Sequence, residues 1–161
     1  MGCEQHARVA GNVHGIATTG FRFFNICGPR QDPCSPYSGV ISIFAERLAS
    51  GRTATIYGDG LQVRDFVYVA DCVRFVIAGM EKTSTEAEVF NVCTGKSASL
   101  LDLVGAMSQG GLALAVEHGP ARVGDIRTSY GDPSRAEAAF GIKAGTTLQD
   151  GLALLIDSLN R

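Results

Sequence analysis

One stretch determines how the chain is organised: Ile56-Tyr-Gly-Asp-Gly-Leu-Gln-Val-Arg-Asp-Phe-Val-Tyr-Val-Ala-Asp71. β-Branched and aromatic residues at 53–57 and again at 63–69 predict two short strands, with Gly58-Asp-Gly60 as the turn between them. Residues 71–81 then predict a helix, because apolar residues recur at helical spacing on one face, namely Val73, Val76, Ile77 and Met80. A strand, turn, strand unit followed by a helix is typical of a mixed α/β protein.

The segments before this stretch alternate in the same way. Residues 3–14 predict the end of a helix, and Ala17–Phe24 predict a strand that stops at Asn25. Three prolines and two glycines within 26–39 exclude a helix or a central strand there and predict an ordered connection. Residues 40–49 again carry apolar side chains at helical spacing before Gly51, so we expect a helix.

The segments after the stretch continue the alternation, and no repeat or linker interrupts it. We expect strands at 89–92 and 112–116, helices at 99–107, 133–140 and 148–159, and a polar loop at 117–132. Ser97 or Ser99 is the expected cap of the first of these helices. The chain is therefore predicted to form one unit of α/β class.

The composition describes a single folded domain. With 161 residues, of which 45% are hydrophobic and 19% charged, the chain is long enough to bury a core. The formal net charge of −2 gives no general attraction to nucleic acid or to an anionic membrane, so neither is an expected partner. The apolar runs are too short to span a bilayer, and residues 1–14 lack the apolar block of a secretion signal. We therefore expect a cytoplasmic protein.

Cysteine and histidine give no sign of a metal site, and no metal is expected. The three histidines have no carboxylate, cysteine or serine partner at a telling spacing, so we interpret them as surface or helix-end residues. An odd number of cysteines without a C-x-x-C pair is typical of free thiols in a reducing compartment, and of neither a disulfide framework nor a zinc site. These cysteines are Cys3, Cys27, Cys34, Cys72 and Cys93.

Four segments resemble a known family. They are Phe21-Arg-Phe-Phe-Asn-Ile-Cys-Gly-Pro-Arg-Gln-Asp-Pro33, the stretch 56–71, Phe90-Asn-Val-Cys-Thr-Gly95 and Arg122-Val-Gly-Asp-Ile-Arg-Thr-Ser-Tyr-Gly-Asp132. In this order they are similar to the extended short-chain dehydrogenase/reductase family of NAD-dependent epimerases and dehydratases, in particular to UDP-glucose 4-epimerases. The resemblance implies the C-terminal half of such an enzyme. Residues 1–25 would be the last helix and strand of the NAD-binding Rossmann domain, and 26–161 the nucleotide-sugar-binding lobe.

The resemblance also implies a binding site for a UDP-sugar. Arg64 and Arg122 match the positions where the family places guanidinium groups on the diphosphate, which suits a planar, permanently charged fork. The alternative for both is an ion-paired surface arginine. Tyr57 matches the aromatic residue at the base, and Val40 lies on the helix that contacts the uridine, with core packing as the alternative for both. Asn25 matches the asparagine near the sugar and phosphate, at the end of a predicted strand, and its alternative is an asparagine that merely caps the strand end.

Three further residues lie in or near the expected site. Ser129 matches the position beside the hexose C2 substituent, where a small side chain tends to go with N-acetylated sugars; its alternative is a solvent-facing loop serine. Phe23 is expected to bind the NAD cofactor of the parent enzyme. Phe44, on the same helix as Val40, is interpreted as an ordinary core residue.

The family's catalytic motifs are absent from this sequence. Its chemistry requires a glycine-rich turn that opens a helix, and a Tyr-x-x-x-Lys pair. The adjacent glycines at 110 and 111 follow a predicted helix, and none of the four tyrosines has a lysine four residues later. Glu4 matches a glutamate that follows that lysine by four residues, which would place the lysine immediately before Met1. We therefore expect no catalytic residue in this chain, NAD only in the full-length parent, and Met1 as an internal methionine.

The functional hypotheses fall into different classes. The first is the substrate-binding part of a UDP-glucose or UDP-N-acetylglucosamine 4-epimerase, which would be inactive alone. The full-length parent enzyme would oxidise the sugar 4-hydroxyl with NAD and reduce the 4-keto sugar from its other face. The second is the same part of a 4,6-dehydratase or a uronate decarboxylase. The third is a non-catalytic UDP-sugar-binding module. In each case the surface that would have met the absent sheet could support a homodimer.

Overall fold

The computed structural model describes residues 2–32, 34–35, 39–108 and 113–159. Its helices are α1 (Gly2–His14), α2 (Val40–Ala49), α3 (Val69–Glu81), α4 (Leu100–Met107), α5 (Ser134–Phe140) and α6 (Leu148–Leu159). Its strands are β1 (Thr19–Phe23), β2 (Asn25–Cys27), β3 (Ala54–Tyr57), β4 (Val63–Arg64), β5 (Phe66–Tyr68), β6 (Glu88–Val92), β7 (Ala98–Ser99), β8 (Val116–Gly119) and β9 (Thr128–Ser129). The predicted α/β class is confirmed.

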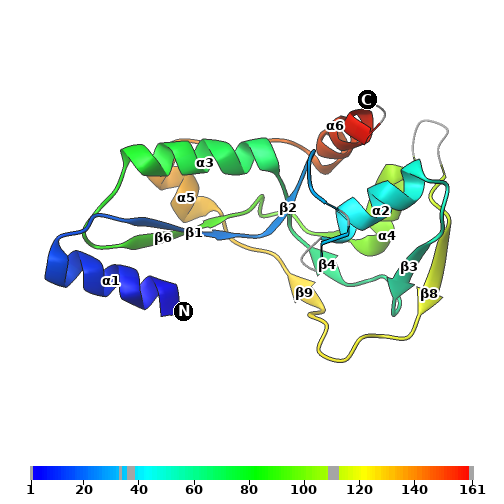
Figure 1. The fold of residues 1–161 in the computed structure, drawn as a ribbon, viewed down its shortest axis with the longest axis horizontal. Helices are drawn as coiled ribbons and strands as arrows, with labels where there is room; N and C mark the ends of the chain where they lie inside the picture. The colour runs from blue at the N-terminus through cyan, green and yellow to red at the C-terminus, as the bar shows by residue number, and fades with distance from the viewer. Residues whose placement is uncertain (1, 33, 36–38, 109–112, 160–161) are drawn as a thin grey trace.

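One part of the molecule is a pair of parallel strands with helices on both sides. Strand β1 runs parallel to β6, with Phe21 opposite Phe90. Helix α1 lies on one side of this pair, and α3 and α5 lie on the other (Figure 1). Parallel strands need such a crossover connection and helical cover on their faces. The buried side chains gather between the sheet, α3 and α5, and they include Val67, Cys72, Phe75, Phe90, Val92, Cys93 and Ala136.

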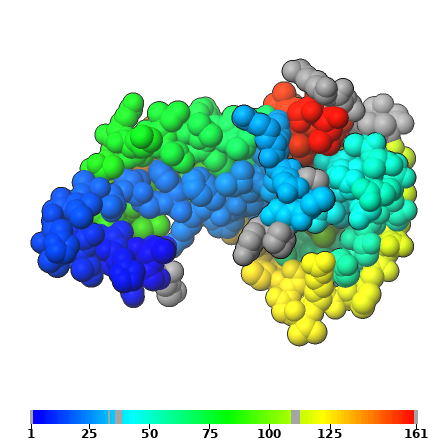
Figure 2. Space-filling view, in the orientation of Figure 1, coloured from blue at the N-terminus to red at the C-terminus, as the bar shows by residue number. Residues whose placement is uncertain are grey.

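The other part is built on short strands and three helices. Strand β3 pairs in parallel with β8, while β4 lies between β7 and β9. Helices α2, α4 and α6 pack against one another there. A second buried cluster fills this part, and it includes Ile41, Phe44, Ile56, Leu103, Met107, Leu152 and Leu155. The parallel pair of β2 and β5 joins the two parts. In Figure 2 the molecule is narrower between the two parts than across either of them.

The strands on either side of the central turn belong to different sheets. Both strands and the turn form, and Gly58 and Gly60 have the positive φ angles of 83° and 75° that such a turn requires. However, the two strands do not pair with each other, because β3 pairs with β8 and β4 pairs with β7 and β9. The predicted strand at 63–69 is also divided into β4 and β5, which are separated by Asp65. The buried Asp65 carboxylate accepts a hydrogen bond from the Thr94 N–H.

Two other expectations need correction. Asn25 does not end a strand: the break is at Phe24, and Asn25 begins β2, where its backbone N–H donates to Asp65 O. A strand was expected at 112–116, but the strand begins only at Val116 and continues to Gly119, within the segment expected to be a polar loop. Leu112 and the neighbouring glycines at 110 and 111 lie outside the described residues.

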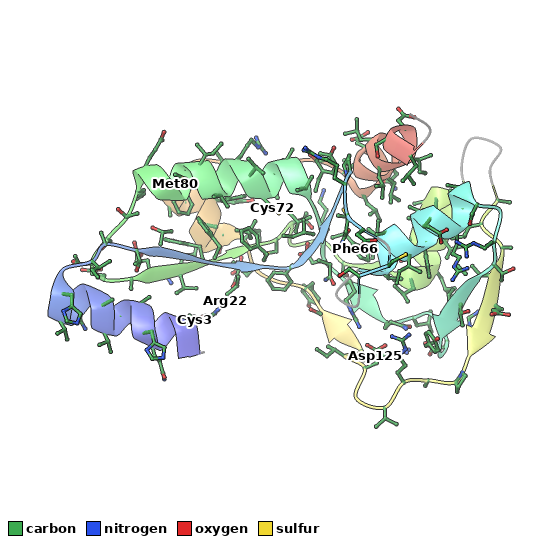
Figure 3. All side chains as sticks on the ribbon, in the orientation of Figure 1. Cys3, Arg22, Phe66, Cys72, Met80 and Asp125 are labelled. Carbon is green, nitrogen blue, oxygen red and sulfur yellow. The ribbon has the colours of Figure 1, made fainter. Side chains whose placement is uncertain are left out.

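The apolar face predicted for α3 points to solvent. Its residues Val73, Val76, Ile77 and Met80 are exposed, and the side chain of Met80, which is 75% exposed, points away from the sheet (Figure 3). The helix buries its other face, with Phe75 and Gly79 towards β1. Both faces are apolar, so periodicity alone could not select the buried one. Within the described part of the chain, no helix is long and apolar enough to cross a membrane.

Candidate functional site

A cavity of about 390 Å³ lies between α2 on one side and β3, β4 and the loop before β9 on the other. This volume is typical of small-molecule sites. The structure brings five of the predicted site residues to its wall, namely Asn25, Val40, Tyr57, Arg64 and Arg122. We call it the nucleotide cavity after the ligand that we propose for it, and its remaining lining residues are Ile43, Phe44, Arg47, Thr55, Gln62, Leu100 and Asp125.

Helix α2 forms one wall of the nucleotide cavity. Val40, Ile43, Phe44 and Arg47 line it, and their i, i+3, i+4, i+7 spacing places them on one face of the helix. Phe44 is only 2% exposed and belongs to the buried cluster, so its interpretation as a core residue is confirmed. This wall is therefore apolar except for the guanidinium of Arg47.

Tyr57 and Arg122 form a stacked pair on the opposite wall. The Arg122 guanidinium carbon lies 3.8 Å from the centre of the Tyr57 ring, a close cation–π contact. Tyr57 is 37% exposed. The stack combines a flat aromatic surface with a positive charge at one place in the cavity. A planar ligand that used this face of Tyr57 would have to displace the guanidinium.

Arg64 is held in place by its own neighbours. Its guanidinium donates to Asp125 Oδ1 at 2.8 Å and to the carbonyl oxygens of Val63 and Ile126. Figure 3 shows Asp125 in the loop between β8 and β9, and Gln62 Nε2 lies 3.5 Å from its other carboxylate oxygen. Arg64 therefore fixes this loop against the cavity, and its charge is partly compensated by Asp125.

Asp65 connects the segments that carry the site through hydrogen bonds. Its side chain is fully buried, and it accepts hydrogen bonds from the Thr94 N–H and hydroxyl and from the Gly95 N–H. Its carbonyl oxygen accepts from both the backbone N–H and the side-chain amide of Asn25. A buried carboxylate with this many donors is fully satisfied and rigid. The amide of Asn25 is thereby fixed at the cavity.

A second cavity, of about 470 Å³, shares Asn25 with the first. We call it the sugar cavity, again after the proposed ligand, and it is lined by Arg22, Phe23, Phe24, Asn25, Asn91 and Ser129. Phe23 is 40% exposed there. Ser129 lies in β9 directly opposite Arg64, which ties the second cavity to the first. All seven predicted site residues therefore line these two adjoining cavities.

One ion pair borders the sugar cavity. The Arg22 guanidinium forms a two-pronged contact with the Glu4 carboxylate, at 2.7 and 2.6 Å, and Figure 3 shows Arg22 pointing towards α1. The hydrogen bond from Arg22 holds the pKa of Glu4 below its ordinary value. The pair fixes the first turns of α1 against β1.

Four polar residues of the nucleotide cavity were not predicted from the sequence, namely Arg47, Thr55, Gln62 and Asp125. Arg47 could have been found, because it continues the helical spacing of Val40 by two turns. Asp125 could have been found from its place three residues after Arg122 within the same motif. Gln62 donates to Tyr57 O at 3.0 Å and is buried, and the local sequence offers no signal for this contact.

The buried cysteines take no part in either cavity. Burial raises the pKa of the Cys27 thiol to about 11, of Cys72 to about 12 and of Cys93 to about 11. Such thiols stay protonated and unreactive near neutral pH. Among the described residues, no cluster of three histidine, cysteine or acidic side chains could hold a metal ion.

Comparison with sequences of known proteins shows what the chain is similar to. Residues 3–93 match the NAD dependent epimerase/dehydratase family. The UDP-glucose 4-epimerase of Mycolicibacterium smegmatis is 39% identical over 156 residues, which make up 96% of this chain and 49% of that protein. The chain spans about half the length of the curated relatives it matches.

Solved structures agree with this match. The UDP-glucose 4-epimerase of Thermotoga maritima, determined with UDP-glucose, has a TM-score of 0.92 and 34% identity over 99% of this chain and 51% of that chain. The UDP-glucose 4-epimerase of Thermus thermophilus, determined with NAD, has a TM-score of 0.85 and 32% identity over 98% of this chain and 51% of that one. The described elements therefore match one half of that fold.

Proposed function

The chain belongs to the NAD dependent epimerase/dehydratase family, and from this membership we propose that it is the UDP-sugar-binding part of a nucleotide-sugar 4-epimerase. One observation carries the proposal: Asn25, Tyr57, Arg64, Arg122 and Ser129 line two cavities that meet at Asn25. An elongated ligand with a base, a diphosphate and a hexose has the shape and the chemistry for that pair of cavities.

The nucleotide cavity suits a nucleoside diphosphate by charge. Three arginines line it, Arg47, Arg64 and Arg122, against one acidic side chain, Asp125. An excess of guanidinium groups beside an apolar helix face and an aromatic ring favours a phosphate attached to a flat ring. We propose that Arg64 and Arg122 hold the diphosphate. Arg122 would then leave the Tyr57 ring, so that the ring can take the uracil.

The sugar cavity suits a hexose with a bulky substituent. Asn25, Asn91 and Ser129 offer polar side chains around it, and a serine leaves more room than an aromatic residue would. We propose that Ser129 lies beside the C2 substituent and admits an N-acetyl group. A Ser129→Tyr variant should weaken binding of UDP-N-acetylglucosamine at least about tenfold by steric exclusion while UDP-glucose binding changes less. Equal losses for both sugars in calorimetry would contradict this role.

We propose that NAD binds mainly to residues outside this chain. Residues 1–25, with β6 and α3 packed on β1, would continue a nucleotide-binding sheet, and 26–161 would form the substrate lobe. Phe23 fits this placement, because it is exposed in the sugar cavity and could face a nicotinamide ring. When bound, NAD supplies the hydride acceptor and donor for oxidation and reduction at the sugar C4. The residues of this chain hold and orient the sugar.

We further propose that this chain alone does not catalyse epimerisation, since its sequence has no Tyr-x-x-x-Lys pair to move the proton of the 4-hydroxyl. Its part in the reaction is positioning. Asn25, fixed by Asp65, and Arg64, fixed by Asp125, place the hexose relative to the diphosphate. Positioning of this kind contributes to catalysis by reducing the motion left to the reacting groups.

Calorimetric titration of UDP-glucose into the chain tests the proposal. We expect saturable binding that Arg122→Met weakens about tenfold or more, because a charge-assisted contact to phosphate is lost. Arg135 is the matched control, since it also stacks on an aromatic ring, that of Phe90, but lines neither cavity. Arg135→Met should leave the affinity unchanged. Absence of binding, or equal effects of the two variants, would overturn the proposal.

A further inference from the structure

Arg47 is the one cationic side chain of α2 that lines the nucleotide cavity. It lies seven residues after Val40, which places it about 10 Å farther along the helix on the same face. Helix α2 begins on the side of β2 and runs towards β3 and β8 (Figure 1). Because Asn25 begins β2, Arg47 is at the end of the cavity farthest from the point where the sugar cavity adjoins it.

The hydrogen-bond donors of Arg47 are available to a ligand. Three of the N–H donors of Arg64 are bound to Asp125 and to two carbonyl oxygens, and Arg122 lies on Tyr57. Arg47 has only an ionic contact of 3.7 Å to Glu46, which is itself bound by Arg52, and no hydrogen bond from its guanidinium to any described residue is present. Its side chain is 36% exposed. The Arg47 guanidinium is therefore half-covered at the end of an apolar wall, and its donors have no hydrogen-bond acceptor among the described residues.

The part of a nucleotide that reaches this end of the cavity follows from its geometry. With the hexose beyond Asn25 and the diphosphate at Arg64, the base points towards Arg47. The C4 position of a pyrimidine lies across the ring from the N1 atom that bears the ribose, so the C4 substituent reaches farthest. In uracil and thymine this substituent is a carbonyl oxygen, which accepts hydrogen bonds, whereas in cytosine it is an amino group, which donates them.

We propose that Arg47 is a specificity residue that donates a hydrogen bond to the C4 carbonyl oxygen of a uracil or thymine base. The inference rests on the proposed function and adds the means by which the base is selected. A cytosine base would bring its amino group against the guanidinium, donor against donor, and both groups would lose their hydration without a partner. Arg47 therefore selects for uridine or thymidine diphosphates and against cytidine diphosphates.

The test compares UDP with CDP, titrated by calorimetry into the full 161-residue chain and into two variants. Arg47→Met removes the donors and keeps most of the apolar stem of the side chain. Arg52→Met is the matched control, since Arg52 is close in sequence and also contacts Glu46 but lines no described cavity wall. We expect the native chain to bind UDP about tenfold or more tighter than CDP, from one charge-assisted hydrogen bond. Arg47→Met should reduce this ratio to within about twofold, mainly by weakening UDP, and Arg52→Met should leave it unchanged.

The outcomes separate this inference from the proposed function. If the native chain binds UDP and Arg122→Met weakens that binding, but Arg47→Met keeps the preference for UDP over CDP, only the role of Arg47 is overturned. If the native chain binds neither UDP nor UDP-glucose, both the proposed function and the inference are overturned. A thermal unfolding curve of each variant, unchanged from that of the native chain, shows that a lost preference comes from the cavity and not from misfolding.

Discussion

At the scale of single residues, Asp65 matters most for the site. It joins β2, the break between β4 and β5, and the turn at Thr94 and Gly95, all from a position without solvent contact. Asp65→Ala should lower the free energy of unfolding by roughly 2–5 kcal/mol, because several buried donors would lose their acceptor. Urea denaturation measures this.

The control for Asp65 is an acidic residue with a similar number of bonds at the surface. Asp59 pairs with Arg127 in a two-pronged contact and is about half exposed. Asp59→Ala should change the urea midpoint only slightly, because water replaces the lost partner. Equal losses in the free energy of unfolding for the two variants would show that the hydrogen bonds of Asp65 do not hold these segments together.

The buried thiols predict how stability changes at alkaline pH. Burial raises the pKa values of Cys27, Cys72 and Cys93 to about 11, 12 and 11, from an ordinary value of 9.0. Above pH 9 the unfolded chain releases these protons while the folded chain keeps them. The contribution of these buried thiols to the free energy of unfolding is therefore fully present below pH 9 and is lost as the pH rises towards 11 and 12. Cys72→Ala should make this fall less steep in urea denaturation at pH 8 to 11.

An exposed cysteine controls for the alkaline effect. Cys3 lies on the surface of α1, so Cys3→Ala should leave the steepness of the fall as it is in the native chain. A fall that is the same in Cys72→Ala as in the native chain would mean that other groups cause it.

The residues of the candidate site were predictable where they belong to a continuous motif. Two family-like segments, 56–71 and 122–132, contain Tyr57, Arg64, Arg122 and Ser129. The structure brings these residues to two adjoining cavities. Pairings across the chain were not predictable. That Asp125 compensates Arg64, 61 positions earlier, follows from the path of the loop and not from any local pattern.

At the scale of elements, the packing of α3 on β1 depends on Gly79. A β-carbon at this position would lie 2.5 Å from Phe21 Cζ and 3.3 Å from Thr19 Cγ2, which is too close for the ring to remain where it is. Gly79→Ala should lower the free energy of unfolding by about 1–3 kcal/mol through overpacking, in spite of the better helix propensity of alanine. Thermal and urea unfolding both report this loss.

Gly105 in α4 is the matched control for Gly79. It also lies inside a helix, but a β-carbon there would meet nothing within 4 Å. Gly105→Ala should therefore stabilise the protein by up to about 1 kcal/mol, the difference in helix propensity. A gain at both positions would show that α3 does not approach β1 as closely as described.

The helices were more predictable than the strand pairing. Val40–Ala49 and Leu148–Leu159 have the bounds that their periodicity predicts, and the cap at Ser99 forms with Asp102 as a full capping box. Helical hydrogen bonds are local, so the sequence within the element specifies them. A short strand such as β4 has partners 34 to 36 and 65 positions away, and turn chemistry at Gly58 and Gly60 does not identify them.

At the scale of the whole molecule, the sheet part leaves apolar surface uncovered. Among the described residues β1 pairs only with β6, so its other edge carries no strand. Val9, Val13 and Ile16 are exposed along and just after α1. We propose that two copies of the chain associate through this surface as a homodimer.

The interface proposal predicts that the chain self-associates as its concentration rises, because exposed apolar surface favours burial against a second copy. Sedimentation velocity measures the association. Val13→Glu, which places a charge on this surface, should weaken the association at least about tenfold, whereas Val123→Glu, in the exposed loop before β9, should not. A chain that stays monomeric at all concentrations would contradict a homodimer.

The most direct test of the central claim is to locate the bound ligand by amide chemical-shift mapping during a titration with UDP-glucose. The two adjoining cavities predict that the largest shifts cluster at Asn25, Tyr57, Arg64 and Arg122, with smaller shifts at Ser129. The chain has a larger cavity of about 1000 Å³ between α4 and the segment before α6, lined by Lys96, Asp102 and Lys143 among others. Shifts confined to that cavity, or no saturable shifts at all, would contradict the assignment of a UDP-sugar site.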